Sequence, residues 1–445
     1  MYSVSRCDTF KRSKPYFYPS RESLMTRKAT IFFLLIFFCT FLNAQEGIVL
    51  DIKIQGAKKT KPSFVKNLVE LKKGMVLDSM LMEKDITRLK RLPSISHAYY
   101  QVFRGDEGSY TVFYTIEENF TLIPFANLFS SSNDDFAFRI GLQEFNLFGK
   151  NMTLGAFYQY DVFNSYGISF RAPYLFGNKF GLAVNYNSFT TQEPVFFDND
   201  TADYKYNNEG FELLGLYELN FKNRLELGFS FFTEDYNYLF GATNPVVPQA
   251  LIVDKHLYKF IYNFDNVNYH YQYLSGFKSS LNLQYVGSSD GSLPDFWIGF
   301  NDFSYYRRVG EKGNWASRLR LGLASNVDTP FAPFTVDNNL NIRGVGNTID
   351  RGTGAIVFNT EYRHTLIDKD WFVLQTNIFL DGGSWRNPGG NFDDFSDNQN
   401  IRIYPGVGLR FMHKRIFNAI FRIDYGYGIT KDGDRGIVFG IGQYF

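Results

Sequence analysis

The strongest constraint on the fold is an alternation of apolar and polar residues that begins after Phe120 and continues to the C-terminus. In residues 419–429, for example, Phe421 and Ile423 alternate with Arg422 and other charged or small residues. Successive side chains of a β-strand point to opposite faces of the sheet, so this period predicts strands with one apolar and one polar face. The alternation alone fits a soluble β-sandwich as well as a membrane barrel.

The lengths of the connections separate these two alternatives. Sixteen expected strands in residues 120–445 leave about 20 residues for each strand with its connection, enough for the ~9–11 residues of a tilted membrane strand. Connections after even-numbered strands are short, whereas long ones follow odd-numbered strands at 191–206, 234–254, 326–353 and 384–400. Short turns at one rim and long loops at the other are typical of outer-membrane barrels. We therefore expect a 16-stranded, antiparallel, all-β transmembrane barrel. Its strands are expected near 121–130, 134–143, 151–161, 166–174, 179–190, 207–219, 223–233, 255–265, 271–287, 294–308, 313–325, 354–366, 371–383, 401–413, 418–429 and 436–445.

The first 44 residues resemble an export segment. After Met25 come two basic residues and then the apolar run Ile31 to Phe38, and the small residue Ala44 marks a cleavage point. This is the pattern of a secretory signal peptide. The alternative is a transmembrane helix, but the run falls short of the ~20 apolar residues that such a helix needs. We interpret residues 1–24 as an over-extended start and Met25–Ala44 as the signal peptide.

Composition excludes several functional classes. The chain has 49 Phe, 30 Tyr and only two cysteines, so it is neither a disordered chain nor a disulfide scaffold. Lys and Arg total 46 against 45 Asp and Glu, and no basic surface for nucleic acid is expected. The five histidines are scattered without metal-ligand spacing, and no catalytic motif appears. We expect no enzymatic activity, no cofactor and no metal site.

Residues 45–119 have a different pattern. A short strand ends at Gly56, two amphipathic helices follow, and Asp78 is placed to cap the second of them. Two further strands are expected near 95–104 and 108–118. The order β-α-α-β-β within about 75 residues resembles a POTRA domain, the periplasmic module that precedes outer-membrane assembly and secretion barrels.

Three sites in the barrel region resemble the BamA/TamA superfamily, which includes bacterial surface antigens. The first is the C-terminal strand, where Phe439, Ile441 and Phe445 share one expected face, as in the β-signal of outer-membrane proteins. The second is Arg343-Gly344 in the long loop before residue 354. The third is the run Phe379-Leu380-Asp381-Gly382-Gly383.

The resemblance implies that the loop folds back into the lumen, where Arg343 meets Phe379 and Asp381. The alternation independently directs both residues inward, and it makes Glu361 a second candidate partner. A confined guanidinium needs a carboxylate to offset its desolvation, and an aromatic ring can stack on it. The alternatives are that Arg343 is an exposed turn residue and that Asp381 is a solvated strand end.

The resemblance also implies a weak seam between the first and last barrel strands. Gly440 and Gly442 lie in the last strand, where glycine weakens pairing and permits a bend. Simple packing in the lumen explains these two glycines equally well.

These features together predict an outer-membrane protein of the BamA/TamA type that inserts or transports polypeptides without covalent chemistry. Its expected partners are the lipid bilayer, unfolded outer-membrane or secreted polypeptide clients, and accessory periplasmic proteins or lipoproteins. The POTRA-like domain is expected in the periplasm. The chain departs from assembly barrels in having room for one POTRA domain rather than several. Two alternatives stay open: a two-partner-secretion-like transporter and a passive solute pore.

Overall fold

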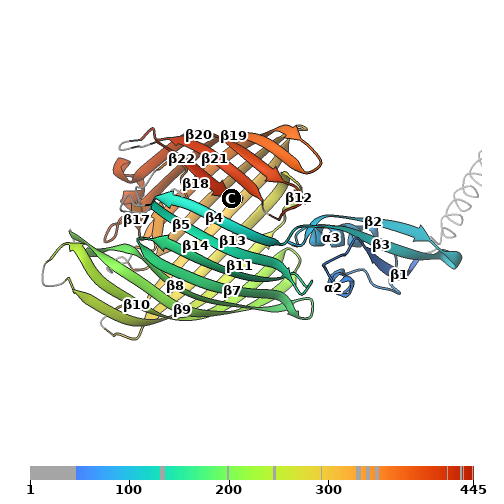
Figure 1. Cartoon of the computed structure of the whole chain (residues 1–445), viewed down its shortest axis with the longest axis horizontal. Coiled ribbons are helices and arrows are strands. Elements are labelled where there is room, and N and C mark those ends of the chain that lie inside the picture. The colour runs from blue at the N-terminus through green and yellow to red at the C-terminus, as the bar shows by residue number, and fades with distance from the viewer. Residues whose placement is uncertain are drawn as a thin grey trace, which may run out of the picture.

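The computed structural model describes residues 47–130, 136–197, 200–243, 247–291, 293–326, 332–336, 341–345, 350–417, 419–430, 433, 435–442 and 444–445. The expected start and signal segment, residues 1–44, lies outside these ranges. Within them, no helix combines the length and apolar character that crossing a membrane requires. A small domain of helices and strands stands beside a large barrel (Figure 1).

The small domain has the strand–helix–helix–strand–strand order that the sequence predicts. Its sheet has the order β1-β3-β2, with β1 parallel to β3. The Asp78 side chain accepts hydrogen bonds from two backbone N–H groups in the first turn of the second helix, so it caps that helix. Apolar side chains of both helices and the sheet, including Val65, Leu89 and Val112, form the buried core. The elements are β1 (Ile48–Gln55), α2 (Pro62–Leu68), α3 (Ser79–Leu89), β2 (Ile95–Arg104), η1 (Asp106–Gly108) and β3 (Ser109–Glu118).

The rest of the described chain forms an antiparallel barrel closed by its first and last strands. The short strand β12 follows β11 and pairs with the same neighbour, β13, so the described barrel has the expected sixteen strand positions. The strands are β4 (Leu122–Ser130), β5 (Phe136–Leu147), β6 (Met152–Asp161), β7 (Phe163–Phe176), β8 (Phe180–Phe197), β9 (Asp200–Asn220), β10 (Asn223–Gly241), β11 (Ala250–Asp265), β12 (Asn268–His270), β13 (Tyr273–Ser288), β14 (Phe296–Val309), β15 (Gly313–Ala324), β18 (Gly354–Asp368), β19 (Phe372–Arg386), β20 (Ile401–His413), β21 (Ile420–Tyr427) and β22 (Arg435–Ile441).

The barrel wall has the two faces that the alternation predicts. Phe421 and Ile423 of β21 are exposed on the outside, while Arg422 and Asp424 of the same strand are buried inside. An apolar exterior and a charged interior invert the arrangement of a soluble sandwich, which buries its apolar face. The membrane-barrel interpretation is therefore confirmed against the sandwich.

Two expected loops are largely strand. Residues 191–197 continue β8, residues 200–206 belong to β9, and residues 234–241 extend β10. Tyrosines 204, 206, 236 and 238 pack together in this extension, with Val195 and Val247 beside them. The prediction of open loops here was wrong because these aromatic side chains bury one another and keep the hairpins paired beyond the barrel rim.

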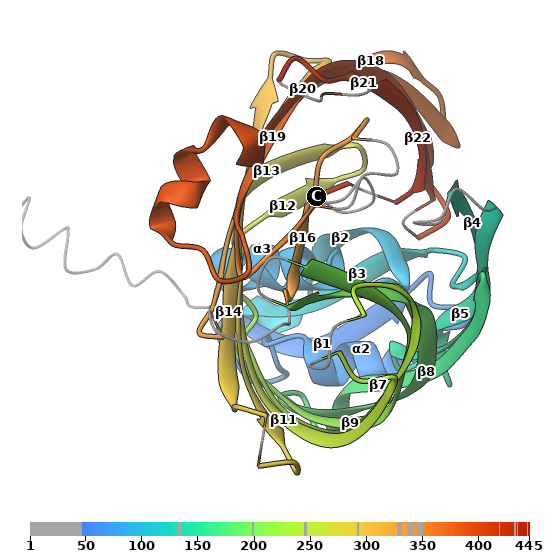
Figure 2. The same cartoon turned by 90° about the vertical axis from the view of Figure 1, so that its left-hand side faces the viewer.

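The junction between β4 and β22 differs from the other strand pairs. Strands β22 and β4 share much less contact than the long strand pairs in the rest of the described barrel. Just before β4, the Phe120 N–H donates to the Arg415 carbonyl at 2.9 Å, which ties the start of the barrel to the turn after β20. The ribbons of β4 and β22 diverge where they face each other (Figure 2).

The small domain lies across one end of the barrel, against the rim that carries the short turns (Figures 1 and 2). Helix α3 and the residues just after it make one set of these contacts. Arg88 is paired with the Glu218 carboxylate at the end of β9, and both side chains are buried. Arg91 donates to the carbonyl oxygens of Phe221 at 3.0 Å and Val267 at 2.9 Å. These contacts hold the domain in one position relative to the barrel.

We expect Arg88→Met to release the small domain from the rim. The change leaves Glu218 buried without its α3 partner, and removing one member of a buried ion pair costs about 3–5 kcal/mol. A spin-label distance between the domain and the barrel in lipid should become broad. The control is Lys84→Met on the same helix, which removes an ion pair with Glu70 whose side chains are about one-third exposed and a cation–π contact of 5.5 Å with Phe221. These exposed contacts are weak, so the distance should stay narrow. Equally narrow distances in both variants would show that Arg88 does not hold the domain.

Candidate functional site

The loop between β15 and β18 enters the barrel, and its segment 341–345 is buried there. The loop also forms a small hairpin of β16 (Phe334–Val336) and β17 (Asp350–Gly352). Ile342 packs with Val336, Trp385 and Tyr404 in one apolar cluster. This cluster holds the loop against the inner faces of β19 and β20 and directs the next residue, Arg343, toward the wall.

Arg343 is completely buried in the lumen. Its Nε and Nη2 donate to the two oxygens of Asp381 at 2.8 and 3.0 Å, and its backbone N–H donates to Asp381 at 3.0 Å. Its Nη1 donates to Glu361 at 2.6 Å. The guanidinium carbon lies 3.7 Å from the ring centroid of Phe379 and 4.5 Å from that of Tyr444. Each of the three guanidinium nitrogens therefore donates to a carboxylate, and two aromatic rings lie within cation–π distance of the group.

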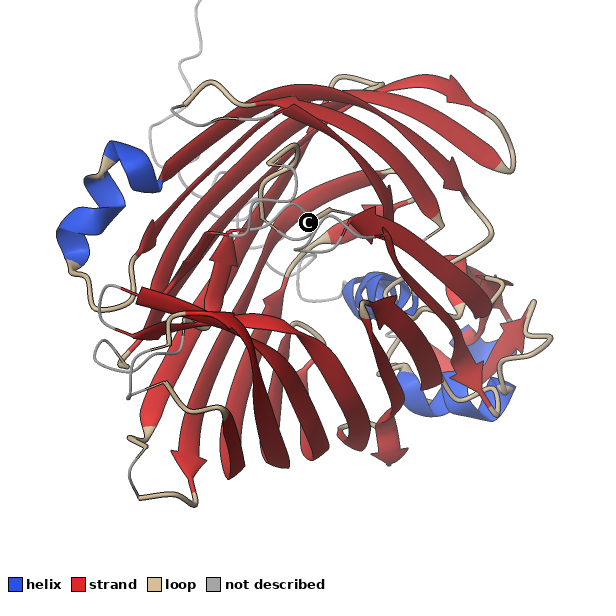
Figure 3. Ribbon diagram, turned by 60° about the vertical axis from the view of Figure 1, so that its left-hand side comes forward, coloured by secondary structure: helices blue, strands red, loops and turns tan. Residues whose placement is uncertain are grey.

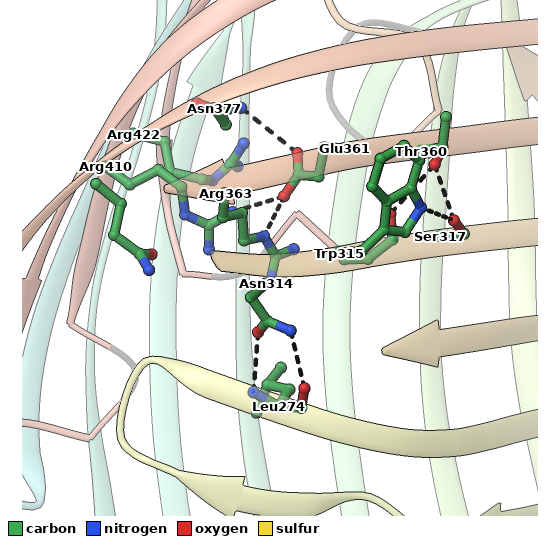
Figure 4. Close-up of polar contacts among 12 residues, drawn as sticks. Leu274, Asn314, Trp315, Ser317, Thr360, Glu361, Arg363, Asn377, Arg410 and Arg422 are labelled. Carbon is green, nitrogen blue, oxygen red and sulfur yellow. Dashed lines mark hydrogen bonds and ion pairs between the residues drawn. The ribbon is translucent and has the colours of Figure 1, made fainter. Parts of the chain in front are cut away.

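Glu361 on β18 joins the loop to other parts of the wall. Besides Arg343, it accepts hydrogen bonds from Arg363 Nε and, at 2.8 Å, from Arg410 Nη1 on β20. Arg363, two residues away on β18, and Arg410 on β20 both pair with the Glu361 carboxylate (Figure 4). One carboxylate thus serves three arginines from three separate segments.

Asp424 adds β21 to the same network. It accepts from Arg422 at 2.9 Å and from the Asn377 side-chain amide at 3.0 Å, and it lies 3.7 Å from Arg343 Nη1. Burying so many charges is costly, and only multiple charge-assisted hydrogen bonds offset the loss of water. The network therefore specifies one position of the loop more than it raises overall stability. Its charged members are Arg343, Arg363, Arg410, Arg422, Glu361, Asp381 and Asp424.

Glycines let the loop approach the wall closely. Gly344 adopts a φ of 95°, and a Cβ there would lie 2.6 Å from the backbone of Gly426 on β21. A Cβ on Gly383 would lie 2.7 Å from Ile342. Larger residues at these positions would push the loop away from the carboxylates.

The structure brings the predicted loop and lumen residues to one place: Arg343, Gly344, Glu361, Phe379, Asp381 and Gly383. Arg343 and Asp381 are each fully buried, so the alternatives of an exposed turn residue and a solvated strand end do not hold.

Sequence reasoning missed several members of the site. Arg410 and Asp424 belong to the charge network, and Gly406 leaves room for the Phe379 ring, which a Cβ would meet at 2.1 Å. Their signal was present in the alternation, which directs Arg410 and Asp424 inward. The pairing of β18 with β19, β20 and β21 in sequence shows that Arg410 and Asp424 meet the other members of the network.

One predicted feature needs correction: Phe445 does not share a face with Phe439 and Ile441. Phe439 and Ile441 point outward and are exposed, but Phe445 is buried in the lumen with Tyr444. Gly442 has a φ of 91°, a left-handed conformation that ends the strand and turns the last residues inward. The physical reason is favourable packing of Phe445 against Val267, Leu274 and the ring of Tyr306.

Gly440 and Gly442, the two glycines predicted to weaken the seam, contact the lumen network. A Cβ on Gly440 would lie 2.2 Å from Arg422, and the Gly442 carbonyl accepts from Arg422 Nε at 2.9 Å. Packing of Arg422 therefore accounts for a glycine at position 440. The role of either glycine in opening a seam stays a prediction.

Among the described residues, no group of three or more His, Cys, Asp or Glu side chains is arranged to hold a metal ion. The chemistry available at the site is ionic and aromatic recognition by side chains of the chain itself.

Comparison with known families matches both parts of the chain. Residues 146–445 match the profile of the Omp85 superfamily domain, and residues 48–119 match a POTRA profile described as a surface antigen variable number repeat. No curated protein matches the chain significantly.

Solved structures share the fold. BamA from Haemophilus ducreyi lacking POTRA domains 1–3 is 16% identical, with a TM-score of 0.51, over 88% of this chain and 84% of that one. CdiB from Acinetobacter baumannii is 14% identical, with a TM-score of 0.57, over 90% of this chain and 74% of that one. CdiB from Escherichia coli is 14% identical, with a TM-score of 0.60, over 88% of this chain and 76% of that one. At these identities the likeness shows the fold alone, a 16-stranded barrel preceded by a POTRA domain.

We expect Arg343→Ala and Asp381→Ala to be strongly coupled in a double-mutant cycle. Each change leaves the other charge buried, so the free energies of unfolding in lipid vesicles should show an interaction of about 1–3 kcal/mol. The control is Arg320 with Asp302, a two-fold hydrogen-bonded lumen pair whose side chains are about one-fifth exposed, with an expected coupling of about 0.2–1 kcal/mol. Additive effects for Arg343 and Asp381 would contradict the buried pair.

Proposed function

The chain belongs to the Omp85 superfamily, and we propose that it inserts other polypeptides into the outer membrane or transports them across it, as proteins of the BamA/TamA type do. The activity is non-covalent. Such an activity requires a barrel that stays folded while one part of its wall pairs with a client polypeptide.

The supporting observation is an unequal distribution of contacts around the barrel. On one side, Arg343 ties the loop to β18 and β19 through Glu361 and Asp381. At the seam, β4 and β22 share much less contact than the long strand pairs, such as β18 with β19. Because buried ion pairs hold the wall at β18 and β19 while the seam between β4 and β22 has little contact, the seam can separate and the rest of the barrel can stay folded.

A client strand enters at that seam in our proposal. Separation of β4 from β22 exposes unpaired backbone N–H and C=O groups, and such an edge pairs with an extended polypeptide. Gly440 weakens the last strand in this proposal, since glycine contributes no side chain to packing and tolerates a bend, and Gly442 ends the strand with its left-handed φ. Phe439 and Ile441 remain on the lipid face of the strand.

An Omp85 barrel with a POTRA domain resides in the bacterial outer membrane. We propose that residues 45–119 lie in the periplasm, because the POTRA domain contacts the rim with the short turns. The proposed division is then 1–44 for the start and signal segment, 45–119 for the POTRA domain and 120–445 for the barrel. Clients are unfolded outer-membrane or secreted polypeptides that arrive from the periplasm, with accessory periplasmic proteins or lipoproteins as further partners.

A two-partner-secretion-like transporter and a passive pore are the alternatives. Burial of segment 341–345 and of Phe445 within the barrel disfavours a passive pore, since both occupy the lumen. Planar-bilayer conductance that is large and unchanged by deletion of residues 45–119 would favour the pore instead. Depletion of the protein followed by comparison of outer-membrane and secreted proteins separates insertion from secretion.

We expect a disulfide between β4 and β22 to stop client assembly. A cysteine placed in β4 (Leu122–Ser130) and another placed in β22 (Arg435–Ile441) form a disulfide on oxidation, which holds the seam closed. Reduction of this disulfide restores opening. Assembly of a client barrel by the purified protein in vesicles is the measurement.

The matched control is a cysteine pair at Leu409 and Ile423, which lie opposite each other on β20 and β21 and face outward. Oxidation of this pair should leave assembly unchanged. Full client assembly by the seam-locked protein would eliminate lateral opening.

A further inference from the structure

Two histidines face each other where the POTRA domain meets the barrel. His97 lies on β2 of the POTRA domain, and His270 lies on the short strand β12 at the rim of the barrel. Their ring centroids are 6.2 Å apart, and the ring planes are inclined at 78°. The helices and strands of the POTRA domain lie together at this end of the barrel (Figure 3). The histidine pair therefore crosses the contact between the two parts of the chain.

Tyr271 holds the His97 imidazole from the barrel side. The two rings are stacked at 16° with their centroids 5.5 Å apart, and the Tyr271 ring also contacts His270 at 5.4 Å. Tyr271 adopts a φ of 51°, a left-handed conformation that residues other than glycine rarely adopt. Three aromatic rings from two parts of the chain thus pack as one cluster, at a turn whose backbone is strained.

The charged side chains around this cluster are mainly basic. One cation, Lys90 at the C-cap of α3, belongs to the POTRA domain and acts on both histidines. Glu117 lies opposite His97 on the neighbouring strand β3. The charged groups that act on the three rings are four cations and two carboxylates: Lys90, Arg308, Lys414, Arg415, Glu117 and Asp368. Since Asp368 is already paired with Lys414, further positive charge at the cluster is poorly compensated.

The surroundings of His97 favour its neutral form while the domain is docked. Burial lowers the pKa of the His97 imidazole, the nearby Lys90 ammonium lowers it further, and the Glu117 carboxylate offsets these effects only in part. Undocking returns the ring to water, where an imidazole has a pKa of about 6.5. The contribution of His97 to docking is therefore complete above about pH 6.5 and is lost as the pH falls below that value. The Tyr271 ring attracts an imidazolium, but Lys90 and a protonated His270 repel it from two sides.

We propose that His97 and His270 form a pH-sensitive latch between the POTRA domain and the barrel, which holds at neutral pH and weakens on acidification. Protonation of His97 places a positive charge on the POTRA side of the contact, and protonation of His270 places one on the barrel side. The two charges repel each other across the contact. The latch is separate from the pair of Arg88 with Glu218, so its loss shifts the docking equilibrium and unfolds neither part. It does not depend on client assembly.

The backbone amide of Lys61 gives a direct readout of docking. Its N–H donates at 2.9 Å to the carbonyl of Gly149, in the turn after β5, so the hydrogen bond crosses from the POTRA domain to the barrel. This amide exchanges with solvent only when that contact opens. Hydrogen exchange of the full-length protein in lipid nanodiscs is measured at single-residue resolution at pH 7.5 and pH 5.5. Each rate is divided by the intrinsic exchange rate at the same pH.

Protection of Lys61 in the wild type should fall at least about 3-fold at pH 5.5. The upper limit is about 10-fold for each histidine, because a free imidazole has a pKa of about 6.5. Protection of Val112, a core residue in the middle of β3, should stay constant, since the POTRA domain itself remains folded.

The double variant His97→Phe with His270→Phe keeps two flat rings in the cluster but removes both titrating groups. Its protection of Lys61 should be equal at the two pH values. A second variant, His97→Gln, carries a neutral polar side chain and should lose the share of the effect that comes from His97.

The matched control is His256→Phe on β11. His256 lies nine residues before Asp265, the residue of that strand that pairs with Arg91 of the POTRA domain, so this variant should keep the pH dependence of the wild type. Constant protection of Lys61 in the wild type, or the same fall in the double variant, would overturn the latch. An equal fall at Val112 would overturn it as well, because the domain would then be unfolding.

Discussion

The pairing of the Arg343 guanidinium with the carboxylates of Asp381 and Glu361 is the contact on which the lumen depends. It joins a loop to two strands at a place from which water is excluded, since all three side chains are fully buried. Removing any member leaves an uncompensated charge, which is far more costly than the net gain of forming the group. The loop therefore has one strongly preferred position.

Arg343 also connects strands β18 and β19 to the residues that follow the last strand. Tyr444, three residues beyond Ile441 in the chain, places its ring 4.5 Å from Arg343 and 5.0 Å from the guanidinium of Arg422. Arg422 in turn donates to the Gly442 carbonyl. Opening of the seam would thus be opposed by contacts inside the lumen as well as by pairing with β4. At the other end, the Asn146 amide donates to the Thr60 hydroxyl at 3.0 Å, so the POTRA domain is joined to the barrel on a second side.

Much of this arrangement was predictable from the sequence because strand geometry leaves few choices. Alternation alone fixes which side of β18 and β19 carries Glu361 and Asp381, and the family resemblance placed the loop arginine on that same side. Phe445 was misplaced because the argument extended a period-two pattern through Gly442, where a left-handed φ ends it. The extended hairpins were missed because mutual burial of Tyr204 and Tyr236 depends on register between distant strands.

The central claim, that the loop is locked inside the barrel, is tested most directly by hydrogen exchange of its backbone amides in lipid nanodiscs. The Arg343 N–H donates to Asp381, and buried hydrogen-bonded amides exchange only when the structure around them opens. We predict that a peptide covering residues 341–345 is protected for as long as the strands β18 and β19. Exchange within seconds, at the rate of an exposed loop, would contradict the account.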